Sequence, residues 1–362
     1  MTTKTQIADQ FELFGRIIAV RRYGSGLINN TFLVTTDCEE NKHVILQCIN
    51  RFVFSYPEQV MENMQRVVDH VMQHQVELPE QDFRLPTLFR TKDGKSYVKD
   101  QNGEFWRAMG FIENTRSFET LQNIRQAEEV GYAVGKFQRL LSDLNPFELH
   151  DTLPGFHVTP QYLAQYDLLG KAHLPDTADI QFCRKAIDTH REFIPVLERA
   201  KEAGQLILRV IHGDPKLNNI LFDEQQGRAV SIIDLDTVKP GLIHYDVGDC
   251  LRSSCNLAGE SPDNDIEVTF DMDVCRAILQ GYVAEAADFL NDIDYAHIYD
   301  AICLLPLELG LRFFTDFIAG NKYFKVDTPD QNLYRAITQF QLLQSIEKQE
   351  AGIRLIIKEL AD

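Results

Sequence analysis

The sequence predicts an α+β protein in which a small β-rich part precedes a larger, mainly helical part. The chain has 362 residues, which is more than one hydrophobic core usually accommodates, so two lobes are expected. Short apolar runs separated by turn residues fill 11–112, and long segments with apolar residues at helical spacing follow from about residue 114. We therefore expect one domain over 1–113 and a second over 114–362.

The first part is expected to consist of strands interrupted by one helix. Apolar runs predict three strands, at 16–20, 31–35 and 43–49. The pairs Asp93-Gly94 and Asn102-Gly103 are typical of tight turns, so we expect two hairpins between further strands there. The helix is predicted over 57–75, where proline suits the first turn and apolar residues recur on one face.

The second part is predicted to be helical, with one exception. Helical patterns occur at 125–144, 184–203, 272–290, 295–319 and 330–360. Between them, residues 206–234 are typical of a strand, a loop and a hairpin whose turn is "DEQQG" at 223–227. Several polar residues lie within this segment, 206–234.

Composition limits the classes of partner. The formal net charge of −18 argues against nucleic-acid binding, because phosphate contacts need clustered Lys and Arg. The seven cysteines are scattered and form no CxxC pair, which fits a reducing cytoplasm rather than a disulfide framework or a structural zinc site. The N-terminal residues lack a signal-peptide pattern, and no apolar run approaches the roughly 20 residues of a membrane helix. We expect a soluble, cytoplasmic protein without nucleic-acid or membrane partners; the oligomeric state stays open.

The stretch "HGDPKLNN" at 212–219 concentrates polar residues directly after an apolar strand. In the expected hairpin, Asn219 and Asp234 lie equally far from the turn and so come side by side. Amide and carboxylate oxygens are ligands that suit Mg²⁺. Asp214 lies within reach of the same ion and Lys216 adds a positive charge, an arrangement that suits phosphoryl transfer. Turn capping by Asp214 and Asn219 is the alternative, and Asp234 weighs against it.

This stretch, with "IIDLDT" at 232–237, resembles the signature of aminoglycoside and choline kinase-like phosphotransferases, which share the protein-kinase fold. The resemblance implies a protein-kinase-like two-lobed fold with ATP and Mg²⁺ as cofactors. It implies that Asp214 is the catalytic Asp, and that Asn219 and Asp234 are metal ligands. The segment "HYDVGD" at 244–249 is similar to a structural segment of this group, which implies a scaffolding role for Asp246.

The segment "YGSGLINNTFLV" at 23–34 is typical of a strand, a Gly-rich turn and a second strand. Its glycines would let backbone N–H groups approach phosphate oxygens. Taken alone, a plain hairpin turn explains it, but its position ahead of the polar hairpin favours a phosphate-covering loop. The nucleotide-binding residues expected here are Gly24, Ser25, Gly26, Asn29 and Asn30.

One position departs from the kinase pattern. The strand reads "VILQ" at 44–47, which puts Gln47 where a kinase carries its phosphate-pairing Lys. Because Gln has no charge, the Lys–Glu ion pair with the following helix, through Glu58 or Glu62, is absent. Either Mg²⁺ and Lys216 neutralise the phosphates, or nucleotide binding is unusual and the protein is a pseudokinase. The adenine is expected near Phe111, Ile112 and Glu113, between the lobes.

Longer segments resemble N-acetylhexosamine 1-kinases, which phosphorylate the anomeric hydroxyl of GlcNAc or GalNAc. They include "VILQCINRFVFSYPEQVMENM", "FWRAMGFIENTRSFE" and "ELGLRFFTDFIAGNKYF". The resemblance implies a sugar 1-kinase, a transferase of carbohydrate metabolism.

Sugar recognition needs fixed polar groups, for which the chain offers His157, Thr159, Asp214 and Arg312. The alternative for His157 is a bond to backbone, and for Arg312 it is an ion pair with Glu308, one helical turn earlier. The acceptor could instead be choline, ethanolamine or an aminoglycoside. Such cations favour carboxylates or an aromatic box, of which the sequence shows no compact cluster.

Overall fold

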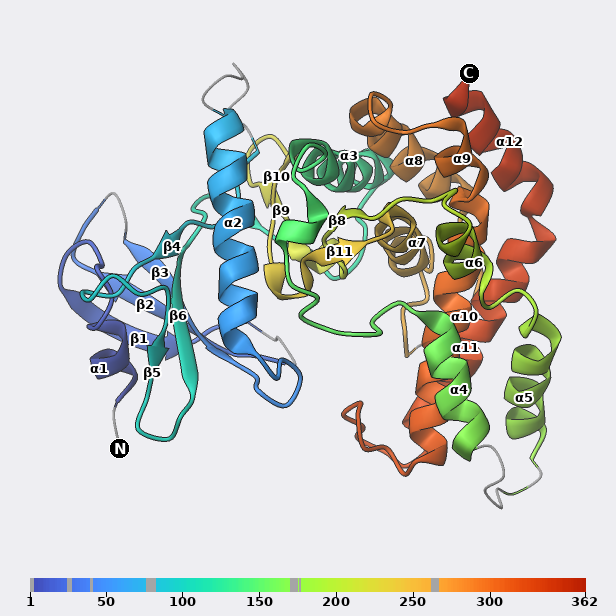
Figure 1. The fold of residues 1–362 in the computed structure, drawn as a ribbon, viewed down its shortest axis with the longest axis horizontal. Coiled ribbons are helices and arrows are strands. Elements are labelled where there is room, and N and C mark those ends of the chain that lie inside the picture. The colour runs from blue at the N-terminus through green and yellow to red at the C-terminus, as the bar shows by residue number, and fades with distance from the viewer. Residues whose placement is uncertain are drawn as a thin grey trace. The chain divides into compact units, whose positions relative to one another are not determined.

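The structure is a computed structural model that describes residues 3–24, 28–39, 42–75, 83–169, 175, 177–261 and 267–362. Contacts within the chain divide it into two compact units, drawn in Figure 1. The first unit comprises Met1–Arg116, Asp143–Leu153 and Leu221–Pro240, and the second comprises Ser117–Ser142, Pro154–Ile220 and Gly241–Asp362. The predicted α+β class is confirmed, with an N-terminal antiparallel sheet and a largely helical C-terminal part. The predicted domain boundary at 113/114 stays a prediction.

The main sheet of the first unit has the strand order β1-β2-β3-β6-β4, and β5 also pairs with β6. The strands are β1 (Ile17–Arg22), β2 (Asn30–Thr36), β3 (His43–Ile49), β4 (Leu88–Phe89), β5 (Val98–Lys99) and β6 (Phe105–Gly110). The three strands predicted first are confirmed. The hairpin predicted at Asn102-Gly103 joins β5 to β6 and is also confirmed.

The hairpin predicted at Asp93-Gly94 is wrong as a pairing of neighbouring strands. The turn itself forms, with Gly94 N–H donating to the Thr91 carbonyl at 2.7 Å. However, β4 and β5 both pair with β6 and not with each other, so they extend the same edge of that strand in succession. A two-residue strand such as β4 carries too little pattern to reveal its partner.

The two faces of this sheet carry different covers, because successive side chains of a strand alternate between faces. On one face, α1 (Lys4–Ala8) packs over Val44, Leu46 and Cys48. On the other, α2 (Pro57–Gln75), which begins at proline as predicted, packs over Ile49 and Phe105. Gln47 of β3 belongs by alternation to the face with Ile49.

The polar hairpin is confirmed. It consists of β9 (Ile220–Asp223) and β10 (Ala229–Ile232), and β9 also pairs with β7 (Thr115–Arg116). At the turn, Asp223 N–H donates to the Arg228 carbonyl and Gly227 N–H to the Asp223 carbonyl, both at 2.9 Å. A further pair of short strands, β8 (Arg209–Ile211) and β11 (Lys239–Gly241), flanks this segment in sequence.

The second unit is mainly helical. Its helices are α3 (Ile124–Leu140), α4 (Thr159–Leu169), α5 (Ala178–His190), α6 (Val196–Glu202), α7 (Ile243–Ser254), α8 (Met272–Ala286), α9 (Asp292–Ala296), α10 (Ile298–Ile318), α11 (Gln331–Lys348) and α12 (Glu350–Ala361). Each of the five predicted helical segments is helical, but the segments at 184–203, 295–319 and 330–360 are each divided into two helices. The sequence did not predict α4 and α7. No helix in the described ranges is both long and apolar enough to cross a membrane.

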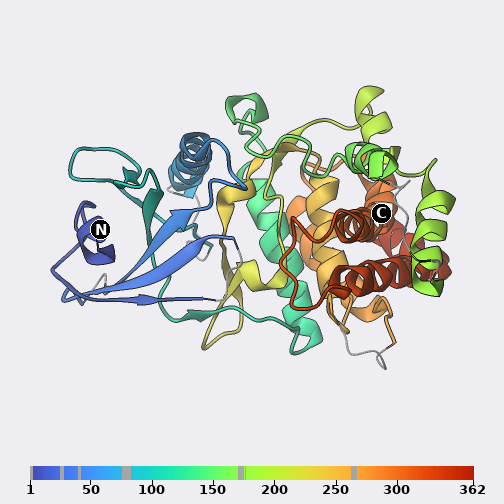
Figure 2. The same ribbon diagram turned by 90° about the horizontal axis from the view of Figure 1, so that it is seen from below.

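The pairing of α3 with α8 is unusually close, and α10 packs likewise along α11 (Figure 1 and Figure 2). A Cβ atom on Gly131 would lie 1.9 Å from the Ile278 carbonyl oxygen, and one on Gly281 would lie 2.0 Å from that of Glu128. Only glycine fits at these two positions, because backbone of the partner helix occupies the space of a side chain. This contact fixes α3, which contributes Gln138 to the site described next.

Candidate active site

The segment predicted to be catalytic, residues 212–219, follows β8 and is held by a carboxylate of α7. Asp246 is fully buried and accepts the N–H groups of His212 and Gly213, each at 2.8 Å, and the Gln138 side-chain amide at 3.0 Å. Burial raises the pKa of Asp246, and the donors oppose this rise. Gly213 has a φ of +85°, a conformation that favours glycine. The geometry agrees with the scaffolding role expected of Asp246, since its bonds fix the two residues before Asp214.

Asp214 lies at the surface of this segment with 28% of its side chain exposed. Its Oδ2 accepts from Lys216 Nζ at 2.6 Å and from Asn219 Nδ2 at 3.4 Å, and its backbone carbonyl accepts from the same amide at 2.8 Å. Burial raises the pKa of Asp214, while the Lys216 ammonium opposes this rise. Both side-chain contacts use Oδ2. The other carboxylate oxygen is therefore the one suited to accept a proton from a hydroxyl.

The two predicted metal ligands flank the β9–β10 hairpin. Asn219 directly precedes β9, and Asp234 follows β10 after one residue, so both lie at the hairpin end opposite the turn. Asp234 adopts the left-handed conformation, with φ 66° and ψ 55°, which is costly for a residue other than glycine. Asn219 donates from its amide nitrogen, which leaves an amide oxygen, and amide and carboxylate oxygens fit Mg²⁺. Their role as ligands stays a prediction.

Gln47 is bonded on both sides within the main sheet. It lies opposite Thr31 of β2 and Arg107 of β6. Its Nε2 donates to Thr31 Oγ1 at 3.0 Å, and its Oε1 accepts from Arg107 Nε at 3.0 Å and from Nη2 at 2.5 Å. The Lys–Glu pair is absent as expected, and Glu62 binds His150 instead. A positive charge nevertheless adjoins position 47, supplied by the neighbouring strand.

Arg107 forms a buried ion pair that the sequence analysis missed. Its Nη2 lies 2.5 Å from Asp236 Oδ1, and the two side chains are 1% and 3% exposed. Asn29 Nδ2 donates to the second oxygen of Asp236 at 2.7 Å, while Asn29 Oδ1 accepts from the Asn50 N–H at 2.9 Å. Asn29 is thus engaged by protein groups. An arginine within the apolar strand "FWRAMG" was the available signal, because a buried guanidinium needs a partner.

The structure describes only some of the other residues of the predicted phosphate loop. Gly24 has a φ of +74°, a conformation that favours glycine. A Cβ atom added at this position would meet no other atom within 4 Å. Ser25 and Gly26 lie outside the described residues. Asn30 pairs with Cys48 across β2 and β3 and faces the α1 side of the sheet, opposite Gln47. We therefore remove Asn30 from the proposed nucleotide-binding residues.

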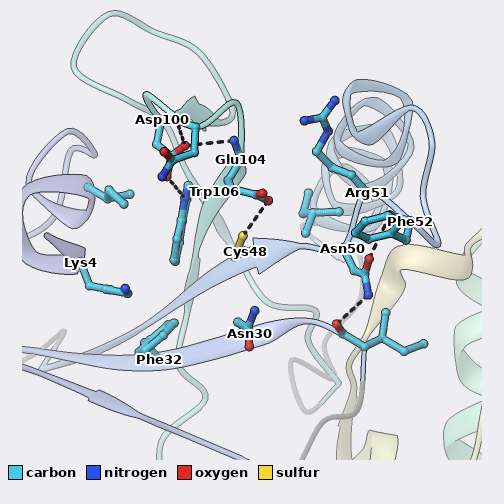
Figure 3. A pocket seen from close by; sticks show the side chains of 14 residues that line it. Lys4, Asn30, Phe32, Cys48, Asn50, Arg51, Phe52, Asp100, Glu104 and Trp106 are labelled. Atoms are coloured by element: carbon cyan, nitrogen blue, oxygen red, sulfur yellow. Dashed lines mark hydrogen bonds between the residues drawn. The ribbon is translucent and has the colours of Figure 1, made fainter. Parts of the chain in front are cut away.

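Asn30 instead lines a cavity of about 870 Å³ in the first unit, shown in Figure 3. The cavity is also lined by Lys4, Cys48, Glu104 and Trp106. Cys48 lies 3.7 Å from Glu104, and burial, with the Glu104 charge, raises the pKa of its thiol to about 12. None of the predicted catalytic, metal or acceptor residues lines this cavity.

The residues expected near the adenine follow β6. Phe111 contacts the rings of Tyr23 and His43 at centroid distances of 5.8 and 5.5 Å. His43 Nδ1 lies 2.7 Å from Glu113 Oε1. Ile112 is buried, and its carbonyl accepts from the Thr115 hydroxyl at 2.6 Å. The contact of this segment with a nucleotide stays a prediction.

His157 and Thr159, predicted to bind the acceptor, both bind Glu308 of α10. The left-handed His157 (φ 65°) bonds Glu308 Oε1 at 3.0 Å and the Gly213 carbonyl at 2.9 Å, and Thr159 Oγ1 donates to Glu308 Oε2 at 2.7 Å. Burial alone would lower the pKa of His157, but the Glu308 carboxylate raises it on balance. Both ring nitrogens are thus engaged within the protein. This geometry favours a bridge from α10 to the residue before Asp214 over direct acceptor contact by His157.

Arg312, the fourth predicted acceptor residue, lies inside an aromatic enclosure. Its guanidinium carbon is 5.0–5.9 Å from the ring centroids of Phe156, Tyr162, Tyr323 and Phe324. The expected partner Glu308 is 3.9 Å away, and 14% of the arginine side chain is exposed. Burial would lower the pKa of Arg312, but the surrounding oxygens raise it. The cation therefore persists in its enclosure.

Asp249 of α7 is a further buried acid that sequence reasoning missed. Its Oδ1 accepts from Arg252 Nε at 2.8 Å. Asp249 also raises the pKa of Asp214, His157 and Arg312 through its charge, although it is not the largest influence on any of them. Burial would raise the pKa of Asp249, but the Arg252 charge lowers it on balance. This pairing holds the buried Arg252 in place within α7.

Comparison with known proteins identifies the family. Residues 19–278, more than half of the chain, match the sequence model of a family described as the phosphotransferase enzyme family, APH. The chain belongs to this family. The phosphotransferase is thus a transferase of the kinase type, as the "HGDPKLNN" stretch implied.

Solved structures of the same fold cover nearly all of this phosphotransferase. A microcompartment-associated aminopropanol kinase has 16% identity and a TM-score of 0.65, with 98% of each chain covered. An aminoglycoside phosphotransferase from Alicyclobacillus acidocaldarius has 14% identity and a TM-score of 0.60, covering 99% of this chain and 97% of that one. A choline kinase from Cryptosporidium parvum has 14% identity and a TM-score of 0.57, covering 96% and 94%. At these identities the likeness establishes the fold.

Proposed function

We propose that this phosphotransferase transfers the γ-phosphoryl group of Mg²⁺-bound ATP to the anomeric hydroxyl of an N-acetylhexosamine, GlcNAc or GalNAc. The proposal joins the family's reaction class to an acceptor suggested by the sequence segments quoted above. The observation that carries the choice of a neutral acceptor is the charge balance around Asp214.

Three acidic side chains of that region have a cationic partner, and a fourth, Asp246, is held by N–H donors of the protein. Lys216 pairs with Asp214, Arg252 with Asp249, and His157 with Glu308. A quaternary or primary ammonium acceptor binds best to unpaired carboxylates or to an aromatic enclosure. The aromatic enclosure found in the described residues holds the protein's own Arg312. A neutral polyol therefore suits this region better than choline or ethanolamine.

Asp214 has the catalytic role in this proposal. It accepts the proton of the anomeric hydroxyl as the oxygen attacks the γ-phosphorus and the bond from that phosphorus to the bridging oxygen of ADP breaks. ADP leaves, and Lys216 offsets phosphate charge. Asn219 and Asp234 would hold Mg²⁺, which when bound neutralises phosphate charge. Arg312 donates hydrogen bonds to acceptor oxygens from its exposed edge. His157 and Thr159 act through Glu308, which they hold.

An acceptor screen tests the proposal. ADP release would be measured with ATP and Mg²⁺ in the presence of GlcNAc, GalNAc, choline, ethanolamine, aminopropanol or kanamycin. We expect turnover with one or both sugars. For every cationic acceptor kcat/KM should be at least about 10²-fold lower, because an acceptor that leaves hydrogen-bonding groups of the site without partners reacts much more slowly. Turnover confined to an amino alcohol or an aminoglycoside would contradict the sugar assignment but leave the phosphotransferase reaction intact.

A further inference from the structure

The buried pair of Arg107 and Asp236 carries an inference about how the metal-binding turn is held. Moving two charges out of water costs free energy that their mutual attraction often fails to offset. A buried ion pair is therefore weak evidence for stability. The pair nevertheless makes further contacts. Gln47 accepts from the guanidinium, and Asn29 donates to Asp236 Oδ2, whereas Asp236 Oδ1 makes the ion contact without a hydrogen bond. These contacts fix the positions of the two side chains.

The network ends next to the predicted metal ligand. Asp236 lies within the single-turn helix Leu235–Thr237, and Asp234 is the left-handed residue that starts this turn. The backbone of Asp236 is also held, since its carbonyl accepts from Thr152 Oγ1 at 3.3 Å. A left-handed aspartate persists only where its surroundings impose it. The Arg107–Asp236 pair supplies that restraint from β6.

Position 47 decides whether Arg107 can serve in this way. The Gln47 oxygen accepts two bonds from one edge of the guanidinium, which sets the plane of the group. A lysine at this position has no acceptor and would put a second positive charge against Arg107. The departure from the kinase pattern at 47 and the arginine on β6 are thus two parts of one arrangement.

We propose that Arg107 is a positioning residue that fixes Asp234 for metal binding through Asp236, and that Gln47 is required to orient it. This inference rests on the proposed function, because it takes Asp234 as a ligand of the nucleotide-bound metal. In this proposal Arg107 acts through Asp236 and not by contact with substrate or metal.

Metal affinity tests the proposal directly. Binding of Mn²⁺ in the presence of ADP would be measured by electron paramagnetic resonance for the full chain. We expect Arg107→Met and Gln47→Lys each to weaken Mn²⁺ binding about 10- to 100-fold, the usual effect of losing a group that orients a metal ligand. Arg90→Met is the matched control, because Arg90 is an exposed arginine of the same unit, and it should bind Mn²⁺ like the wild type.

The double variant Gln47→Lys/Arg107→Met distinguishes loss of the contact that positions Asp234 from a general loss of stability. Here the lysine can itself pair with Asp236, so Mn²⁺ affinity should recover at least about 5-fold relative to the weaker single variant. If Arg107→Met does not fold, Arg107→Lys is used; it keeps the charge but not the two-pronged donation, and should bind at an intermediate level.

Unchanged Mn²⁺ affinity in folded Arg107→Met, or a double variant no better than the worse single variant, would overturn the proposal. Wild-type protein that binds Mn²⁺ with ADP but phosphorylates no acceptor would contradict the proposed reaction and leave the positioning role standing. Wild-type protein that binds no Mn²⁺ would overturn the positioning role.

Discussion

Asp214, the base of the proposed reaction, is held by bonds to residues close to it in sequence. Lys216 and Asn219 hold one carboxylate oxygen, and Asp246 fixes the backbone just before it. The geometry of this carboxylate is therefore set by a short segment rather than by distant parts of the chain. A substitution that keeps its shape should remove chemistry without removing structure.

Replacing Asp214 by Asn makes that test. We expect kcat to fall about 10²- to 10⁴-fold, because the amide cannot accept the hydroxyl proton, while KM for ATP changes less than about 2-fold. Steady-state kinetics with the accepted sugar measures both. Asp188→Asn is the control, since Asp188 is an exposed acid of the same unit. Wild-type kcat in Asp214→Asn would exclude this residue as the base.

His244 predicts a loss of stability at acidic pH. It is buried on α7, its Nε2–H donates to the Asp294 carbonyl at 2.9 Å, and burial lowers its pKa to about 4. The unfolded chain takes up a proton near pH 6.5, so the contribution of neutral His244 is complete above that pH and is lost as pH falls towards 4. Between pH 7.5 and 5 we expect this group to cost about 2 kcal/mol of unfolding free energy.

Urea unfolding followed by far-ultraviolet circular dichroism at the two pH values measures this cost. His244→Gln keeps a donor for Asp294 but does not titrate, so its stability should fall about 2 kcal/mol less than that of the wild type. His150→Gln, at a more exposed histidine, serves as the control. An equal decline in wild type and His244→Gln would show that other groups cause the acid sensitivity.

At the scale of elements, the crossing of α3 and α8 is the contact least tolerant of change. Gly281→Ala should lower the free energy of unfolding by about 2 kcal/mol or more, because its methyl group would meet backbone of α3. Gly352→Ala is the matched control in a helix. Its methyl group would meet only the flexible end of Met272, at 3.0 Å, so we expect no loss or a gain of up to about 1 kcal/mol. Equal effects of the two substitutions, in urea unfolding, would contradict the close crossing.

The strands of the first unit were predicted from apolar runs bounded by turn residues. Helix α2 was predicted because its apolar residues recur at helical spacing on the face that it buries. Helix α7 was missed because many of its buried residues are polar, so that its burial does not follow an apolar pattern in the sequence. The long predicted helices divide at His190–Val196, where Pro195 marks the break, and at His297 and Gln349, where no proline does.

The sequence predicted the site contacts between residues close in sequence, but not those between residues far apart in sequence. The hairpin turn places Asn219 and Asp234 at one end because only a few residues separate each from the turn. The pairing of Gln47 with Arg107 spans 60 residues and depends on the register of β3 against β6. That register is set by packing and not by local pattern, so the sequence indicated an uncharged position 47 without indicating the cation beside it.

For the whole molecule, the candidate residues are distributed over both compact units. Gln47, Arg107 and Asp234 belong to the first, and Asp214 and Asn219 to the second. The core of the structure consists of buried apolar side chains. We expect metal to be required for the reaction but not for the fold, because burial of apolar surface is the main force that stabilises such cores.

Chelation with EDTA tests this distinction. Turnover should fall at least about 10²-fold and return on adding Mg²⁺, because phosphoryl transfer depends on the metal to neutralise phosphate charge. The far-ultraviolet circular dichroism spectrum and the thermal midpoint without nucleotide should stay unchanged. A collapse of the spectrum on chelation would show that metal is structural.

The most direct measurement is phosphorus nuclear magnetic resonance of the product formed from ATP, Mg²⁺ and GlcNAc or GalNAc. We predict a new phosphorus signal coupled to the anomeric proton of the sugar, absent with Asp214→Asn. A signal coupled to the two protons at C6, or product formed only from choline or an amino alcohol, would contradict the central claim.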